Sequence, residues 1–306
     1  MHVPASSLGA TGAGLQPQAG TGVALLALLA GAVAMGVSPV FVRLAEVGPY
    51  SSAFWRVFAA LPVLWAWSQL EDRSKSPLRG WSWPVVIAGL LFSGDLIFWH
   101  LSIMKTSIAN ATFLATLAPV WVLLGSNLIL REATTRGMWL GLGACLAGAA
   151  LLVGSNLGIA PERLIGDGFG VMTSVFFGAY ILATRYVRRS LGPGGLMFRS
   201  SLVTSICLLL VALMLDDKLL PETSRGWAAL AGLALLAHAA GQGLLAFALG
   251  RLTAGFSALV IFLEAVTAAA FAWIALGEAL RILQIAGGLL ILFGIWIARP
   301  GRPSSN

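Results

Sequence analysis

Long runs of apolar residues, separated by short polar breaks, dominate the chain. A helix needs about 20 apolar residues to cross the core of a bilayer, and ten runs come close to that length. We therefore predict an all-α integral membrane protein with ten transmembrane helices, over residues 22–42, 53–69, 84–103, 108–130, 137–154, 168–187, 197–215, 228–248, 254–277 and 282–298. The breaks between these runs are too short to hold a soluble catalytic domain.

The stretch from Lys105 to Gly148 has a counterpart later in the chain. A shift of 146 residues places Lys105 on Arg251 and Glu132 on Glu278, without a gap. If each copy holds five spans, the odd number puts the second copy into the membrane upside down, which makes an inverted repeat. The expected organisation is a tail over 1–21, a first five-helix repeat over 22–154, a linker over 155–167, a second five-helix repeat over 168–298 and a tail over 299–306.

Composition and charge support a membrane protein and argue against other classes. Hydrophobic residues make up 58% of the chain and charged residues 10%, too few polar groups for a surface that faces water. The net charge of +7 comes from scattered cations without a basic stripe, so no nucleic-acid partner is expected. Loop cations favour cytoplasmic termini. Neither a phosphate-binding loop nor a pair of metal-ligand residues is present in the sequence, so we expect no cofactor and no metal.

Three short motifs carry a resemblance to a known family. They are Phe54-Trp55-Arg56 with its counterpart Met197-Phe198-Arg199, the run Leu117-Ala118-Pro119-Val120 that leads to Glu132, and the run Leu263-Glu264-Ala265-Val266 that leads to Glu278. With these motifs the chain resembles the EamA-type members of the drug/metabolite transporter superfamily. It departs from their pattern at Ala265, where proline is usual, and at Arg131, where glycine is usual before the glutamate.

The resemblance implies both a fold and a function. The fold would be ten helices in two inverted five-helix halves. The function would be export of amino acids or related metabolites across the bacterial inner membrane, with both termini in the cytoplasm. Among such proteins the chain looks most like the YddG-like aromatic amino acid exporters. The implied partners are a small-molecule substrate and the lipid bilayer, and the expected state is a monomer or a weak homodimer.

Ionisable residues in the middle of apolar spans are the main candidates for function, because such groups are costly there unless they face a cavity or a partner. Asp95, His238 and Glu264 lie on the order of 15 Å deep, at 1.5 Å per residue. The repeat places Asp95 opposite Gly241, on the helix that also carries Gln242. We expect a substrate site with aromatic walls, which include Phe262, and the binding residues Asp95, Trp99, His238, Gln242, Glu264, Trp121 and Tyr180. Plain hydrogen bonding between helices is the alternative.

Several other residues have two interpretations each. Gly36, Pro39 and Pro119 weaken their helices and could be gating hinges, although kinks filled by neighbouring helices are equally compatible. Arg56 and Arg199 could bind a carboxylate, but the predicted spans put them in the first helical turns, where they would snorkel to the interface. Glu132 is expected to pair locally with Arg136. Glycines of the last span in each half are expected to allow close helix packing.

These patterns favour a secondary transporter that works by alternating access. A carboxylate among apolar groups can take up a proton near neutral pH, so Glu264 or Asp95 could couple transport to protons, whereas a facilitator needs no such group. One alternative is an integral membrane enzyme that acts on lipid-linked substrates, with Asp95 or His100 catalytic. Others are an exporter of drugs or nucleosides, and a channel.

Overall fold

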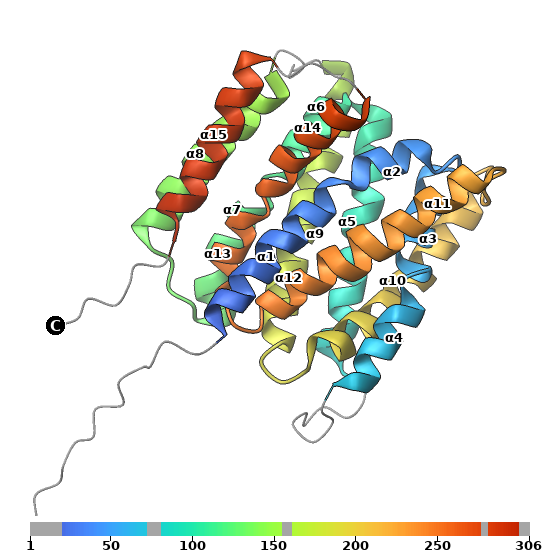
Figure 1. Ribbon diagram of the computed structural model, residues 1–306, viewed down its shortest axis with the longest axis horizontal. Coiled ribbons are helices and arrows are strands. Elements are labelled where there is room, and N and C mark those ends of the chain that lie inside the picture. The colour runs from blue at the N-terminus through green and yellow to red at the C-terminus, as the bar shows by residue number, and fades with distance from the viewer. Residues whose placement is uncertain (1–19, 72–80, 155–160, 277–280, 300–306) are drawn as a thin grey trace, which may run out of the picture.

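The computed structural model describes residues 20–71, 81–154, 161–276 and 281–299, which form a bundle of helices without a strand (Figure 1). The first half of the chain contains α1 (Thr21–Gly36), α2 (Ser38–Leu44), α3 (Pro49–Phe58), α4 (Leu61–Leu70), α5 (Trp83–Lys105), α6 (Ile108–Ala115), α7 (Ala118–Gly125), the π-helix η2 (Ser126–Leu130) and α8 (Arg136–Val153). The second half contains the 3-10 turn η4 (Pro161–Arg163), α9 (Leu164–Val187), α10 (Pro193–Leu215), α11 (Ser224–Gly232), the π-helix η5 (Leu233–Gln242), α12 (Gly243–Ala248), α13 (Ala254–Val260), α14 (Leu263–Leu276) and α15 (Ile282–Ile297).

Within the described ranges, eight helical stretches are long and apolar enough to cross a membrane. They correspond to eight of the ten expected spans. The expected span over 53–69 is instead two short helices, α3 and α4, which meet at Ala59 and Ala60 just before Pro62. The last expected span is α15, an apolar helix of 16 residues. Within the described residues, hydropathy thus located the apolar segments, but it did not reveal where the backbone breaks.

The two ends of the helical bundle need names, because the site is described relative to them. Helix α1 begins and α15 ends on the same side, which we call the terminal side (Figure 1). The other side, where α2 ends at Leu44 and α5 ends at Lys105, is called the opposite side. These two names are used below because the structure itself contains no membrane.

Helix α10 runs antiparallel to α3 and α4, and a carboxylate joins the partners at each end. On the opposite side, the N–H and hydroxyl groups of Ser51 donate to Asp216 Oδ2 over 2.5 and 2.8 Å. On the terminal side, the N–H groups of Gly194 and Gly195 donate to Glu71 over 2.7 and 3.0 Å. Each carboxylate follows one helix and satisfies free N–H groups at the start of the other.

Helices α8 and α15 form a second antiparallel pair at the edge of the bundle (Figure 1). Their backbones approach closely at glycines: a Cβ atom at Gly148 would lie 2.6 Å from the carbonyl oxygen of Gly287, and one at Gly141 would lie 2.5 Å from that of Gly294. No side chain fits at such distances. The packing role expected for these glycines is therefore confirmed for Gly141, Gly148, Gly287 and Gly294, whereas Gly143 faces open space.

We expect Gly148→Val to destabilise the protein by about 1–3 kcal/mol, because overpacking forces the two backbones apart. Gly143→Val on the same helix is the matched control, since a Cβ there meets nothing within 4 Å. Thermal unfolding of the purified variants in detergent measures the difference. Equal melting temperatures for the two variants would contradict the close packing of α8 on α15.

A left-handed residue ends the π-helix η2. Arg131 has φ +56°, a conformation that L side chains rarely adopt and that glycine adopts readily. This backbone explains why glycine suits this position in the family that the chain resembles. Arg131→Gly should therefore stabilise the protein by about 0.5–1 kcal/mol, once the greater flexibility of unfolded glycine is subtracted. Unfolding in detergent checks this, and a lower melting temperature of the variant would refute it.

Candidate functional site

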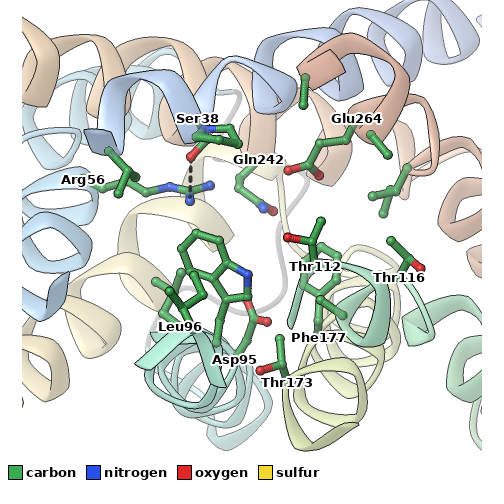
Figure 2. A pocket seen from close by; sticks show the side chains of 18 of the residues that line it. Ser38, Arg56, Asp95, Leu96, Thr112, Thr116, Thr173, Phe177, Gln242 and Glu264 are labelled. Carbon is green, nitrogen blue, oxygen red and sulfur yellow. Dashed lines mark hydrogen bonds between the residues drawn. The ribbon is translucent and has the colours of Figure 1, made fainter. Parts of the chain in front are cut away.

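A cavity of about 320 Å³ lies in the middle of the bundle, between the two halves of the chain (Figure 2). Helices α2, α3, α5 and α6 contribute from the first half, and α9, η5 and α14 from the second. The lining consists of Ser38, Pro39, Val42, Arg43, Arg56, Phe92, Asp95, Leu96, Trp99, Ile103, Thr112, Ala115, Thr116, Thr173, Phe177, Gln242, Ile261, Phe262, Glu264, Ala265 and Ala268. Apolar and aromatic side chains make most of the wall, and a few polar groups point inward.

Asp95 and Trp99, both expected in the substrate site, line this cavity together. Both belong to α5, which is unbroken over 23 residues, so their positions are fixed by a regular helix. The Asp95 side chain is buried, with 9% of its surface exposed. His100 faces elsewhere: its Nδ1 lies 2.6 Å from the carbonyl oxygen of Leu96, and its ring lies 5.7 Å from that of Tyr50.

Glu264 reaches the cavity from a break in the helix. Helix α13 ends at Val260, and Glu264 lies in the first turn of α14. This position suits a carboxylate, because the N-terminus of a helix favours negative charge. The small residues Ala265 and Ala268 leave room beside it, so Glu264 faces open cavity volume.

Gln242 and His238 lie on the π-helix η5 but in different surroundings. Gln242 lines the cavity, and its Oε1 has no hydrogen-bond partner within the part of the chain that the structure describes. His238 is fully buried outside the cavity, where its Nε2 lies 2.8 Å from Ser201 Oγ. The His238 ring stacks on Phe92, with 5.5 Å between centroids. His238 thus supports a wall residue and does not face the cavity.

Two of the expected aromatic residues also lie outside the cavity. Tyr180 packs behind Phe92, with 4.8 Å between ring centroids, and its hydroxyl lies 3.8 Å from the sulfur of Met197. Trp121 lies partly exposed on the bundle surface, and its indole N–H donates to Ser174 Oγ over 2.9 Å. Phe92 and Phe177 line the cavity instead of them.

Arg56 is the main cavity residue that the sequence interpretation placed elsewhere. Helix α3 begins at Pro49, not at residue 53, so Arg56 lies in the last turn of its helix. Its side chain enters the cavity, and Nη1 donates to Ser38 Oγ over 3.3 Å (Figure 2). The Gly48-Pro49 pair could have revealed this, because proline is favoured at the first position of a helix.

The three expected hinge residues lie at helix breaks or close contacts. The break between α1 and α2 falls at Val37, and Pro39 follows it and lines the cavity. Gly36 packs against α14: a Cβ there would lie 2.9 Å from the carbonyl oxygen of Glu264 and 2.6 Å from Cβ of Thr267. Gly36 therefore allows a close approach beside the cavity.

Proline is not needed for the break in the repeated segment. In the first copy the helix breaks at residues 116–117, and Pro119 follows in the first turn of α7. In the second copy the helix breaks at residues 261–262, although Ala265 stands at the equivalent position. The break thus recurs in both copies, and tertiary packing accounts for it where proline is missing.

Charged groups close the terminal side. Arg185 Nε lies 2.6 Å from Glu132 Oε1, and Arg185 Nη1 donates to the carbonyl oxygen of Leu249 over 2.7 Å. Glu132 Oε2 accepts from the N–H of Ala254, the first residue of α13, over 2.8 Å. The expectation of a local Glu132–Arg136 pair is therefore wrong, because the glutamate turns toward the second half. Its counterpart Glu278 lies outside the described residues.

Arg188 is half-buried at this end of the bundle. Burial lowers the pKa of the Arg188 guanidinium, just after the end of α9, to about 10, against a smaller opposing effect of Glu71. Arg188 still donates to the carbonyl oxygens of Ala246 and Leu191. Leu123 of α7 and Phe256 and Leu259 of α13 are buried in the main apolar core.

Among the described residues, no three His, Cys, Asp or Glu side chains gather as they would around a metal ion. The residues that line the cavity offer recognition by charge, hydrogen bonds and aromatic contact. Two arginines, Arg43 and Arg56, two acids and one amide line it within mainly apolar walls.

Comparison with known proteins identifies the sequence pattern and the fold. The model of the EamA-like transporter family matches the chain twice, over residues 22–154 and 164–299. A solved crystal structure is similar, with a TM-score of 0.81 and 18% sequence identity, over 91% of this chain and 97% of that one. At this identity the likeness concerns the fold alone. A comparison with curated protein sequences gives no match.

Proposed function

Because this chain belongs to the EamA-like transporter family, we propose that it is a secondary transporter that exports amino acids or related small metabolites. The observation that carries the proposal is the cavity between the two halves, with Arg56, Asp95 and Glu264 deep among apolar walls. Ionisable groups at this depth are costly and are usually found on substrate or ion pathways. The family supports transport of small molecules, and the cavity supports the substrate class.

The arrangement of the two halves supports alternating access as the proposed mechanism. In our proposal the ten apolar segments form two inverted five-helix repeats, and the antiparallel pairs α10 with α3–α4 and α8 with α15 support that symmetry. The cavity extends toward the opposite side, where Arg43, Ile103 and Thr112 line it. On the terminal side, Glu132 and Arg185 join the halves. Rocking of the halves would open one side as the other closes.

The membrane orientation is part of the same proposal. We place the terminal side, with both chain termini, in the cytoplasm of a bacterial cell, and the protein in the inner membrane. Loop cations support this orientation through the positive-inside rule. The conformation of the structure then opens to the outside, and breaking the Glu132–Arg185 contact would open the cytoplasmic side to load substrate.

The membrane-enzyme alternative receives less support from the geometry. It required Asp95 or His100 as a catalytic group, and His100 is held against Leu96 outside the cavity. The cavity volume of about 320 Å³ is also at the low end of the roughly 300–1,000 Å³ typical of small-molecule sites. A lipid-linked substrate would need a larger or laterally open site. Nucleosides and other metabolites remain competing substrates for the same cavity.

Flux into proteoliposomes tests the proposed function. The purified protein should carry radiolabelled amino acids with saturable kinetics, and unlabelled substrate on the far side should accelerate the exchange. Nucleosides and a cationic drug serve as competing substrates, and protein-free liposomes give the background. If only nucleosides show saturable flux, the protein carries nucleosides and not amino acids. The absence of any flux above background would refute transport of all these compounds.

A further inference from the structure

Arg56 brings a fixed positive charge into the cavity without a matching acid. Its guanidinium stays protonated in proteins and has five donor N–H bonds. Its Nη1 donates to Ser38 Oγ over 3.3 Å, and its buried Nε has no hydrogen-bond partner among the described residues. No ion pair of Arg56 occurs in that part of the chain either. The planar guanidinium of Arg56 therefore faces the cavity with N–H donors that have no acceptor among the described residues.

The two acids of the cavity stand apart from Arg56 (Figure 2). Arg56 enters from α3 and Glu264 from α14 on the other side, and Asp95 rises from α5 between them. Charges buried without partners are costly, so a ligand that supplies both missing partners is favoured. A carboxylate suits the guanidinium, since the two groups form paired, charge-assisted hydrogen bonds. An ammonium group suits the acids.

The rest of the wall defines the remainder of the ligand. Phe92, Trp99, Phe177 and Phe262 supply aromatic surface, and Ile261 adds aliphatic surface. Trp99 lies one helical turn from Asp95, so a cation held by the carboxylate also meets an aromatic ring. The volume of about 320 Å³ fits one small molecule with an apolar side chain.

From this arrangement we infer that Arg56 binds the carboxylate of a free, zwitterionic amino acid with an apolar side chain, whose ammonium group lies toward Asp95 and Glu264. The inference rests on the proposed transport function and names the residue that selects the substrate. Arg56 thereby makes a free carboxylate a requirement. Amides, esters and simple amines with the same side chain are rejected, because they leave the guanidinium buried and unpaired.

Matched ligands test this requirement on the full-length protein in nanodiscs. Leucine, leucinamide and 4-methylpentanoate share one side chain and differ only in the carboxylate and the amine, and phenylalanine with its amide gives a second pair. Competition binding against labelled leucine should rank leucinamide at least roughly 30-fold weaker than leucine, the loss expected for one buried charge partner. Leucinamide that binds as tightly as leucine would overturn the assignment of Arg56.

Variants separate a binding role from a structural role. Arg56→Gln should abolish the preference for leucine over leucinamide, and Arg56→Lys should restore part of it, because the charge returns without the planar fork. Arg199→Gln is the matched control: Arg199 is the repeat counterpart of Arg56 and does not line the cavity. It should keep the preference of the parent protein. The ratio of the two affinities is the readout, so a general loss of stability does not imitate the result.

The outcomes distinguish this inference from the proposed function. Saturable leucine flux with no discrimination between acid and amide overturns the role of Arg56 and leaves transport intact. Loss of discrimination in Arg199→Gln to the same extent as in Arg56→Gln also overturns it. No saturable binding or flux for any compound of the panel overturns the proposed amino acid transport and this inference with it.

Discussion

Replacing Glu132 by alanine is expected to lower the free energy of unfolding by about 3 kcal/mol, since removal of one partner leaves the other charge of a buried pair uncompensated. The pair is well shielded: 11% of the Glu132 side chain and 17% of the Arg185 side chain are exposed. The same substitution also frees the N–H of Ala254. Reversible unfolding in mixed detergent micelles measures the loss.

An exposed ion pair of the same chain provides the control. Lys218 and Glu222 lie 3.1 Å apart at i and i+4, with 43% and 79% of their side chains exposed. Glu222→Ala should change stability by no more than about 0.5 kcal/mol, because solvent screens such pairs. If Glu132→Ala is as mild as Glu222→Ala, the Glu132 contact does not hold the terminal side together.

If the contact is also the gate we propose, Glu132→Ala should make a cysteine introduced by Leu123→Cys accessible to a thiol reagent.

Asp95→Asn is expected to weaken amino acid binding roughly 30-fold or more, while Glu264→Gln is expected to remove the response of transport to a pH gradient. Asp95 lies on the unbroken helix α5 beside Trp99, in a fixed position that suits an ammonium group. Glu264 lies next to a helix break with open cavity volume around it. In the proposed mechanism, a group in that position exchanges a proton with the open side and moves as the halves rock.

Two flux assays separate these roles. Exchange of labelled for unlabelled substrate needs binding and movement only, and net flux under a pH gradient also needs proton coupling. Glu264→Gln should retain exchange and lose the acceleration, and Asp95→Asn should lose both. Asp167→Asn is the control, because Asp167 accepts hydrogen bonds from Thr106 and Asn110 outside the cavity. If the net flux of the parent protein is the same with and without a pH gradient, the protein is a facilitator without proton coupling.

The sequence located the two acids of the cavity but did not place Arg56 beside them. Asp95, Gln242 and Glu264 interrupt long apolar runs, so the cost of polar groups in lipid marks them directly. Arg56 escaped this test because hydropathy began the span at residue 53, which made the arginine look like an interfacial residue. The helix starts at Pro49, and that start depends on backbone capping, to which hydropathy is insensitive.

Contacts between distant residues could not be read from local spacing. Glu132 has Arg136 four residues away, yet it contacts Arg185 and Ala254. His238 and Tyr180 look like site residues by depth and type, but they pack behind Phe92. Which face of a helix meets a cavity depends on how all the helices are arranged, and one helix's pattern does not contain that information.

The carboxylates Glu71 and Asp216 give the chain a property of dimers. In a twofold dimer of identical subunits, a contact from residue i to residue j is always accompanied by the same contact from j to i. Here the acid after α4 caps the start of α10, and the acid after α10 caps the start of α3. One polypeptide therefore carries both copies of an isologous contact. A mutation can alter the Glu71 contact without altering the Asp216 contact. The contacts at the two ends of the bundle can therefore differ in strength, which is impossible for two identical subunits.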